Sequence, residues 1–151
     1  MGISKTILVQ HNMDMIRRNT DYAIRAMSLL AASYGDAPVS TATIAGEQDI
    51  SYPLASKLLQ RLQEAKLVAS SMGVRGGFRL SRDPRRITLL EVIEAIQGKV
   101  SLNRCLVSTK ACTRRRVCPV RRRLGPIQET LTEALRQTTL RDLLAEKGTI
   151  A

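Results

Sequence analysis

Two short segments with helical periodicity, joined by a tight turn and followed at once by a glycine-tipped hairpin pattern, constrain the fold of this chain most. Ser40 is placed to cap the first helix, and residues 49–51 form the turn. Ser51 is an N-cap for the second helix, and Pro53 is tolerated in its first turn. One apolar stripe is expected on the second helix, made of Leu54, Leu58, Leu62 and Ala65. This order predicts a helix-turn-helix.

The hairpin pattern begins directly after the second helix. Residues 67–71 and 78–80 are strand-like, and the segment between them contains Gly73, Gly76 and Gly77. A hairpin in this place is the wing of a winged helix-turn-helix. The sequence therefore predicts a fold that is mainly α with a small β-hairpin wing.

The remaining patterned segments are helical. Apolar residues recur at helical spacing over residues 19–34, from Thr88 to Gly98, and from Pro126 to Gln137. Aromatic residues make up only 3% and Trp is absent, so the core must be aliphatic, which suits packed helices. We divide the chain into an N-terminal extension (1–14), a winged helix-turn-helix DNA-binding domain (15–98), a cysteine-containing sensor loop (99–125), and a long C-terminal dimerisation helix with its tail (126–151).

The charge of the chain indicates the class of its partner. The net charge is +11, which favours a polyanion, and double-stranded DNA is the expected one. No apolar run approaches the roughly 20 residues that span a bilayer, so no membrane partner is expected. No signal-peptide pattern opens the chain, which predicts a cytoplasmic protein. No catalytic constellation is present, so an enzyme is not expected.

The second helix and the wing carry the candidate DNA contacts. A helix fits the major groove, where polar side chains read base edges, and Arg75 on the wing suits the minor groove. A homodimer would match a palindromic operator. The alternative is a polar helix face that is merely solvated. The predicted DNA-binding residues are Ser40, Ser51, Tyr52, Pro53, Ser56, Lys57, Gln60, Arg61, Arg75, Gly76 and Gly77.

The chain has three cysteines, Cys105, Cys112 and Cys118, all in its most basic stretch. No acidic residue occurs between Glu94 and Glu129. Positive surroundings favour thiolates, which bind metals and react with oxidants. The wide spacing fits an iron–sulfur cluster better than a zinc knuckle. A redox disulfide, inert thiols and phosphate-binding arginines remain the alternatives.

Several of these segments together resemble the Rrf2 family of bacterial winged-helix transcriptional regulators. The resemblance covers roughly Met15 to Leu144, and it implies a dimeric transcription factor. In cluster-binding members three cysteines hold a [2Fe–2S] or [4Fe–4S] cluster, which implies the same role for Cys105, Cys112 and Cys118. The matching segments are residues 19–27, 50–54, 67–68, 76–80 and 87–89, together with the three cysteines.

The chain departs from the family pattern at three places. Some members have a histidine three residues after the third cysteine, where this chain has Arg121. Others use an aspartate from the first helix of the partner subunit, and Asp21 matches that position; its alternative role is to interact with the helix dipole. The first cysteine gap is one residue longer than the common one, which leaves the cluster type open. At the wing, Met72 replaces a frequent arginine, and Arg75 is expected to take its place.

The predicted function is therefore a regulator, and specifically a repressor, whose operator binding is switched by the cluster in response to iron–sulfur or iron status, nitric oxide or redox stress. A sample purified in air can lack the cluster. One alternative is a cluster-free winged-helix regulator switched by thiol oxidation or a protein effector. Another is a DNA-independent iron–sulfur carrier or accessory protein.

Overall fold

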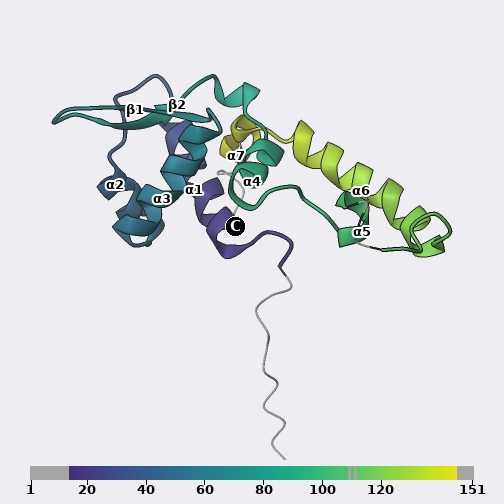
Figure 1. Cartoon of the computed structure of the whole chain (residues 1–151). Coiled ribbons are helices and arrows are strands. Elements are labelled where there is room, and N and C mark those ends of the chain that lie inside the picture. The colour runs from purple at the N-terminus through teal and green to yellow at the C-terminus, as the bar shows by residue number, and fades with distance from the viewer. Residues whose placement is uncertain (1–13, 109, 111, 146–151) are drawn as a thin grey trace, which may run out of the picture.

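The computed structural model describes residues 14–108, 110 and 112–145 (Figure 1). Figure 1 shows α1 to α4, the hairpin and α7 gathered in one body, from which α5 and α6 extend as an arm. The elements are α1 (Arg18–Ala32), α2 (Thr41–Gln48), α3 (Tyr52–Glu64), β1 (Val68–Ser71), β2 (Gly77–Leu80), the short 3-10 helix η1 (Pro84–Arg86), α4 (Leu89–Gln97), α5 (Arg104–Val107), α6 (Pro119–Gln137) and α7 (Leu140–Ala145). The predicted fold class, mainly helical with one small antiparallel hairpin, is confirmed. No helix in the described ranges is long and apolar enough to cross a membrane.

The N-terminal ends of α2 and α3 follow the capping signals of the sequence. The Ser40 hydroxyl accepts a hydrogen bond from the Thr43 backbone N–H at 3.0 Å, and the Ser51 hydroxyl accepts one from Leu54 at 3.4 Å. Asp49 closes α2 in a left-handed conformation with φ of 51°, which short polar side chains tolerate. Residues 49–51 therefore form the turn between α2 and α3, as predicted.

The core of the body forms around α1. Met27 and Leu30 of α1 pack with Leu59 and Leu62 of α3 and with Val92 of α4. The predicted stripe on α3 is partly wrong, because Ala65 is exposed and Leu54 is only half-buried. The reason is that α3 lies against several elements at once, which cover a wider face than one row of side chains. The buried residues of α3 are Ala55, Leu58, Leu59 and Leu62.

The wing is anchored to the segment before α2. Strand β1 pairs antiparallel with β2, from Val68 opposite Leu80 to Ser71 opposite Gly77. The Val39 N–H donates to the Phe78 carbonyl at 2.9 Å, and the Phe78 N–H donates to the Val39 carbonyl at 2.8 Å. A Cβ at Gly77 would lie 2.4 Å from the Val39 carbonyl oxygen, so only glycine permits this approach. The base of the hairpin is thereby held rigidly to the body.

The arm differs from its prediction at its start. The long helix was predicted to begin at Pro126, but α6 begins at Pro119, and Pro126 lies inside it. The reason is that Pro119 already takes the proline-tolerant first turn, and the loss of one backbone hydrogen bond at Pro126 does not end the helix. The first turns of α6 thus belong to the segment predicted as the sensor loop.

After the arm the chain returns to the body. Leu140 of α7 is 0% exposed and packs in the main core. Its N–H donates to the Ile87 carbonyl at 3.0 Å, and the Leu89 N–H donates to the Thr138 carbonyl at 2.8 Å. The body is therefore completed by residues on both sides of the arm, whereas the four-part division by function remains a prediction.

Candidate functional site

The recognition helix presents its predicted base-reading residues on one surface. Pro53, Lys57 and Gln60 are exposed, Ser56 is half-buried, and Tyr52 is 57% exposed at the start of the helix. The side chains of Pro53, Ser56, Lys57 and Gln60 lie opposite the buried leucines of α3, and their spacing places them on adjacent turns. The structure therefore brings together a polar, accessible surface of the size that a major groove admits.

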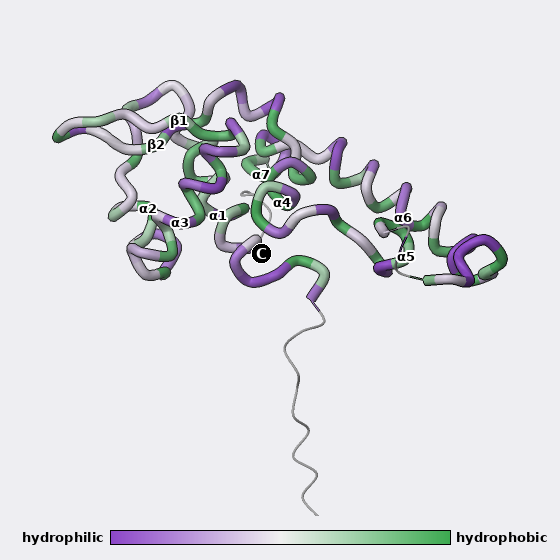
Figure 2. Tube along the Cα trace, viewed as in Figure 1, coloured by the Kyte–Doolittle hydropathy of each residue, from purple (hydrophilic) through white to green (hydrophobic). Residues whose placement is uncertain are grey.

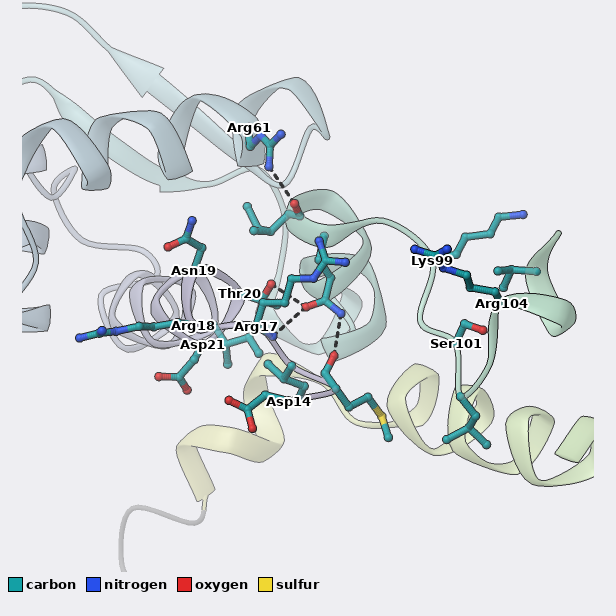
Figure 3. Close-up of a pocket in the computed structure, with 17 residues that line it drawn as sticks. Asp14, Arg17, Arg18, Asn19, Thr20, Asp21, Arg61, Lys99, Ser101 and Arg104 are labelled. Atoms are coloured by element: carbon teal, nitrogen blue, oxygen red, sulfur yellow. Dashed lines mark hydrogen bonds between the residues drawn. The ribbon is translucent and has the colours of Figure 1, made fainter. Parts of the chain in front are cut away.

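Three other predicted contacts have roles within the protein. The hydroxyls of Ser40 and Ser51 cap α2 and α3. The Arg61 guanidinium donates to the Ile96 carbonyl at 2.8 Å, which joins α3 to the C-terminal end of α4 (Figure 3). Arg61 stays a predicted DNA contact, and in the single chain its side chain is engaged with α4.

The wing glycines also serve the protein itself. The Gly76 N–H donates to the Gly73 carbonyl at 2.9 Å, which closes a turn with Val74 and Arg75 at its centre. A Cβ at Gly76 would lie 2.4 Å from the Ser71 carbonyl oxygen. Gly76 and Gly77 are among the predicted DNA contacts, and contacts within the chain are by themselves sufficient to require glycine at both positions. Arg75 remains exposed at the tip.

The three cysteines lie along the arm. Cys105 in α5 and Cys118 at the N-terminal end of α6 are half-buried, and Cys112 is exposed. The Arg121 Nε–H donates to the Cys105 carbonyl oxygen at 3.1 Å, which links the two ends of the cysteine loop. Arg121 occupies the position of the histidine discussed above, and its side chain is engaged with the backbone.

The three thiols of the loop are ligands that suit a thiophilic metal centre, although they do not converge on one point in the single chain. Within residues 14–108, 110 and 112–145, no three His, Cys, Asp or Glu side chains converge on one point. Three thiols in acid-free, arginine-rich surroundings nevertheless match the chemistry of iron–sulfur ligation. A cluster therefore fits these residues if the loop closes around it and the fourth ligand comes from elsewhere.

The positive charge of the loop is not compensated by nearby carboxylates. The ion pairs found among the described residues join Arg25 to Asp21, Arg82 to Glu91 and Arg136 to Glu133. None of these arginines belongs to the loop of residues 99–125, whose seven arginines are Arg104, Arg114, Arg115, Arg116, Arg121, Arg122 and Arg123. The described part of one protomer thus leaves the loop electropositive, which favours anionic species there.

A groove of about 1330 Å³ lies between the N-terminal end of α1, the C-terminal end of α4 and the segment that leads into the arm (Figure 3). Asp21 lines it, with 57% of its side chain exposed. Figure 3 places Lys99, Ser101 and Arg104 on the far side of the groove from Asp21. Asp21 therefore lies on an accessible surface, across the groove from Arg104, which precedes Cys105 in the sequence.

Asp21 is also the first member of a chain of polar contacts that reaches the helix-turn-helix. Its carboxylate lies 3.7 Å from the Arg25 guanidinium. Arg25 in turn donates to both the Gln48 side-chain oxygen and the Gln48 backbone carbonyl, each at 3.1 Å. Gln48 ends α2, immediately before the turn into α3. The arrangement connects the groove surface to the base of the recognition helix.

Arg25, Gln48 and Gln97 organise this region, and the sequence patterns did not predict them. The Gln97 side-chain oxygen accepts from the Thr20 hydroxyl at 2.8 Å and from the Arg17 N–H at 3.1 Å. The spacing of Asp21 and Arg25, one helical turn apart, is a signal that could have been found. Gln48 and Gln97 carry no such signal, because their partners are distant in the sequence.

Comparisons with known proteins identify the family of the chain. Residues 16–146 match the family model described as "Rrf2: Iron-dependent Transcriptional regulator". The HTH-type transcriptional repressor NsrR of Streptomyces coelicolor is 32% identical over 127 residues, which cover 83% of this chain and 85% of that protein.

Solved structures agree with this match. CymR (YrzC), described as the global cysteine regulator of B. subtilis, superposes with a TM-score of 0.73 at 27% identity, covering 87% of this chain and 97% of that chain. IscR of T. potens superposes with a TM-score of 0.71 at 28% identity, covering 90% and 91%. The predicted family and its winged-helix fold are confirmed, as is the prediction that the chain is not an enzyme. The chain belongs to the Rrf2 family of DNA-binding transcriptional regulators.

Proposed function

We propose that this regulator is a homodimeric repressor whose operator binding is switched by an iron–sulfur cluster on Cys105, Cys112 and Cys118. The observation that carries the proposal is the acid-free, arginine-rich loop that holds all three cysteines of the chain. The description of the family model as iron-dependent supports it. The proposed signals are iron or iron–sulfur status, nitric oxide and redox stress.

The DNA-binding surface would consist of the exposed face of α3 and the wing. Pro53, Ser56, Lys57 and Gln60 would reach base edges in the major groove, and Tyr52 would contact the backbone. Arg75 would face the minor groove, where its charge is favourable. A net charge of +11 supports strong binding to phosphates that weakens as salt rises.

The second copy of the chain would cover the apolar face of α6. None of the residues of this helix, all of which the structure describes, is buried in the single chain. Leu131 and Leu135 near its C-terminal end pack on the body, whereas Val120 and Ile127 are 56% and 55% exposed. Two arms that pair along this face would place two recognition helices for a palindromic operator.

The cysteine loop would supply three thiolates, and Asp21 of the second copy is the proposed fourth ligand. More than half of the Asp21 side chain is exposed, as such a role requires. The arginines of the loop would offset the negative charge of thiolates and sulfides. A bound cluster would supply a centre that is sensitive to redox change and to nitric oxide. The coupling of that centre to DNA binding would depend on the residues of the chain.

Coupling to DNA would run through Arg25. While Asp21 pairs with Arg25, the guanidinium is held beside Gln48 and braces the C-terminal end of α2. When the Asp21 carboxylate binds the cluster, Arg25 loses its ion-pair partner. The hydrogen bonds of Arg25 to Gln48, which brace the turn before α3, would then weaken. A coupling free energy of about 1–3 kcal/mol would alter operator affinity roughly 5- to 150-fold.

The first test is anaerobic purification of the wild type and of Cys112→Ala, with visible spectra and assays of iron and acid-labile sulfide. We expect a coloured wild type with stoichiometric iron and sulfide, and a colourless variant. A wild type that stays iron-free after anaerobic reconstitution would overturn the cluster proposal and favour thiol oxidation or a protein effector. Failure to bind duplex DNA in a salt-dependent manner would instead favour a DNA-independent carrier.

The coupling is tested with Arg25→Ala, using Arg18→Ala as the matched control. Both arginines lie 5.6 Å from the Tyr22 ring centre, but among the described contacts only Arg25 bonds Gln48. We expect Arg25→Ala to bring the ratio of operator affinities of loaded and cluster-free protein close to one. Arg18→Ala should keep the wild-type ratio. An unchanged ratio in Arg25→Ala would overturn this route while leaving the cluster assignment intact.

A further inference from the structure

The tip of the wing carries two fully exposed apolar side chains. Met72 is 98% exposed and Val74 is 107% exposed, the two highest values among the exposed large apolar residues. They flank Gly73, which has a φ of 109°, a conformation that L side chains rarely adopt. In Figure 2 the end of the hairpin that projects farthest from the body is coloured as hydrophobic. An apolar tip is unexpected on a protein with a net charge of +11.

The hairpin presents this tip firmly. Val74 and Arg75 occupy the centre of the turn closed by the Gly76 N–H and the Gly73 carbonyl, so their side chains point outward. The strands behind the turn are paired and joined to Val39 on the body. Ordering the tip upon binding therefore costs little backbone entropy, since the backbone is already fixed.

A single exposed apolar residue needs no explanation. Here Val74 adjoins Arg75 at the centre of the turn and Met72 directly precedes the turn, and the hairpin that carries them follows α3 in the chain. The arginine suits the negative potential of a minor groove, and the apolar atoms suit its sugar walls. The tip thus combines the two kinds of side chain that one DNA surface accepts.

We propose that Met72 and Val74 lie in the minor groove beside the α3 site and exclude G·C pairs there. The proposal rests on the DNA-binding surface proposed above. In the minor groove A·T pairs present only acceptors, whereas a G·C pair adds the N2 amino donor of guanine. Apolar side chains over that amino group would bury a donor that neither of them can pair with. The wing would therefore select A·T pairs by penalising the amino group.

The test uses a duplex selected from a random-sequence library by the wild-type protein, with the wing position located by hydroxyl-radical footprinting. At that position adenine is replaced by 2,6-diaminopurine, which adds the minor-groove amino group and leaves the major-groove edge unchanged. We expect the wild type to lose roughly 5- to 100-fold in affinity, the cost of one buried unpaired donor. Replacing guanine by inosine at any G·C pair there should have the opposite effect.

Two variants assign the effect to the tip. The double variant Met72→Ser/Val74→Ser should lose less than about threefold on the diaminopurine duplex, because hydroxyls can pair with the amino group. Arg75→Ala should weaken binding to both duplexes alike and lower the salt slope by about one. Circular dichroism of each variant checks that the fold is kept, which is expected because these residues touch no core side chain.

The outcomes separate this proposal from the one on which it rests. Equal wild-type affinity for the two duplexes, or undiminished discrimination by the double serine variant, would overturn the role of Met72 and Val74. If the wild type selects no duplex at all, the proposed DNA surface fails as well. If the wild type selects a duplex but contains no iron or sulfide, the cluster proposal is overturned. The wing proposal is then decided by the affinities for the two duplexes alone.

Discussion

The body and the arm of this protein bury their apolar side chains to very different degrees. In the body, α1, α3 and α4 each contribute several buried apolar residues to a shared core. In the arm, the 19-residue helix α6 contributes none, and Val117, Val120 and Ile127 are more than half exposed. A long helix whose apolar face is covered only near its C-terminal end, as by Leu131 and Leu135 here, is stable along its whole length only when another surface covers the rest.

The difference separates two kinds of stability. The body satisfies its own core within one chain, so its folding should be unimolecular. In the proposed dimer a second copy would cover the apolar face of the arm, so the order of the arm should depend on protein concentration. Signals that act on the arm would then alter the geometry of the proposed dimer without unfolding the body.

The largest expected effect comes from α7, which belongs to the body although it follows the arm. Leu140→Ala removes a side chain that is 0% exposed and packs in the main core. We expect a loss of about 2–5 kcal/mol in the free energy of unfolding, measured by chemical denaturation. Ile127→Ala on the arm is the matched control and should change the unfolding of dissociated protein by less than about 0.5 kcal/mol. Equal losses would show that the body and the arm are one folding unit.

The opposite pattern is expected for association. Ile127→Asp places a charge on the exposed apolar face of α6 and should raise the dimer dissociation constant at least about 100-fold, because an unpaired charge would be buried in the interface. Sedimentation velocity over a dilution series measures this. Glu129→Ala, also exposed on α6, is the control and should leave the dimer intact. A wild type that stays monomeric over the dilution series would contradict the proposal that a second copy covers the apolar face of α6.

A smaller effect is expected at the junction of the wing with the body. In Gly77→Ala the new Cβ would lie 2.4 Å from the Val39 carbonyl oxygen, and backbone on both sides must shift. We expect a loss of about 1–3 kcal/mol, measured by thermal denaturation. Gly46→Ala is the matched control, because nothing lies within 4 Å of its Cβ in α2. It should stabilise the protein by about 0.5–1 kcal/mol.

The same contrast explains what the sequence could predict. Within the body, capping residues and periodicity predict the helix ends, since Ser40, Ser51 and Thr88 act over three or four residues. The start of α6 was mispredicted because both Pro119 and Pro126 match the local signal of a proline in the first turn of a helix. Likewise, the place of Leu140 in the core depends on contacts with α1 and η1, which no local pattern encodes.

The candidate site divides in the same way. The residue types of the cysteine loop and of the α3 surface were predictable from local composition and spacing. The engagement of Arg61 with Ile96 and of Arg25 with Gln48 was not, because each pair joins helices that only the tertiary fold brings together. Ligands from a second copy are further removed still, since no pattern in one chain records the geometry of its dimer.

The smallest expected effect concerns Asp142, at the start of the helix that joins the arm to the body. Hydrogen bonds from the Thr139 backbone N–H and then from the Thr139 hydroxyl hold the pKa of Asp142 below its ordinary value of 3.8. A lowered pKa means that the carboxylate stabilises the folded state above the ordinary value, and that this contribution is lost as the pH falls through the lowered one. Asp142→Asn should therefore melt below the wild type near neutral pH, and the difference should shrink on acidification below about pH 4.

Thr139→Ala keeps the backbone N–H but removes the hydroxyl, which donates to the Asp142 carboxylate and accepts from the Asp142 N–H. The part of its effect that varies with pH should therefore follow the same trend with a smaller amplitude. Melting temperatures of the three proteins across this pH range give the comparison. A difference between wild type and Asp142→Asn that stays constant with pH would contradict the assignment. Asp142 accepts the hydrogen bonds of Thr139 at the start of α7, the helix that carries Leu140. Confirmation would therefore show that the acid sensitivity of α7 belongs to the body, whose folding needs no partner, and not to the arm.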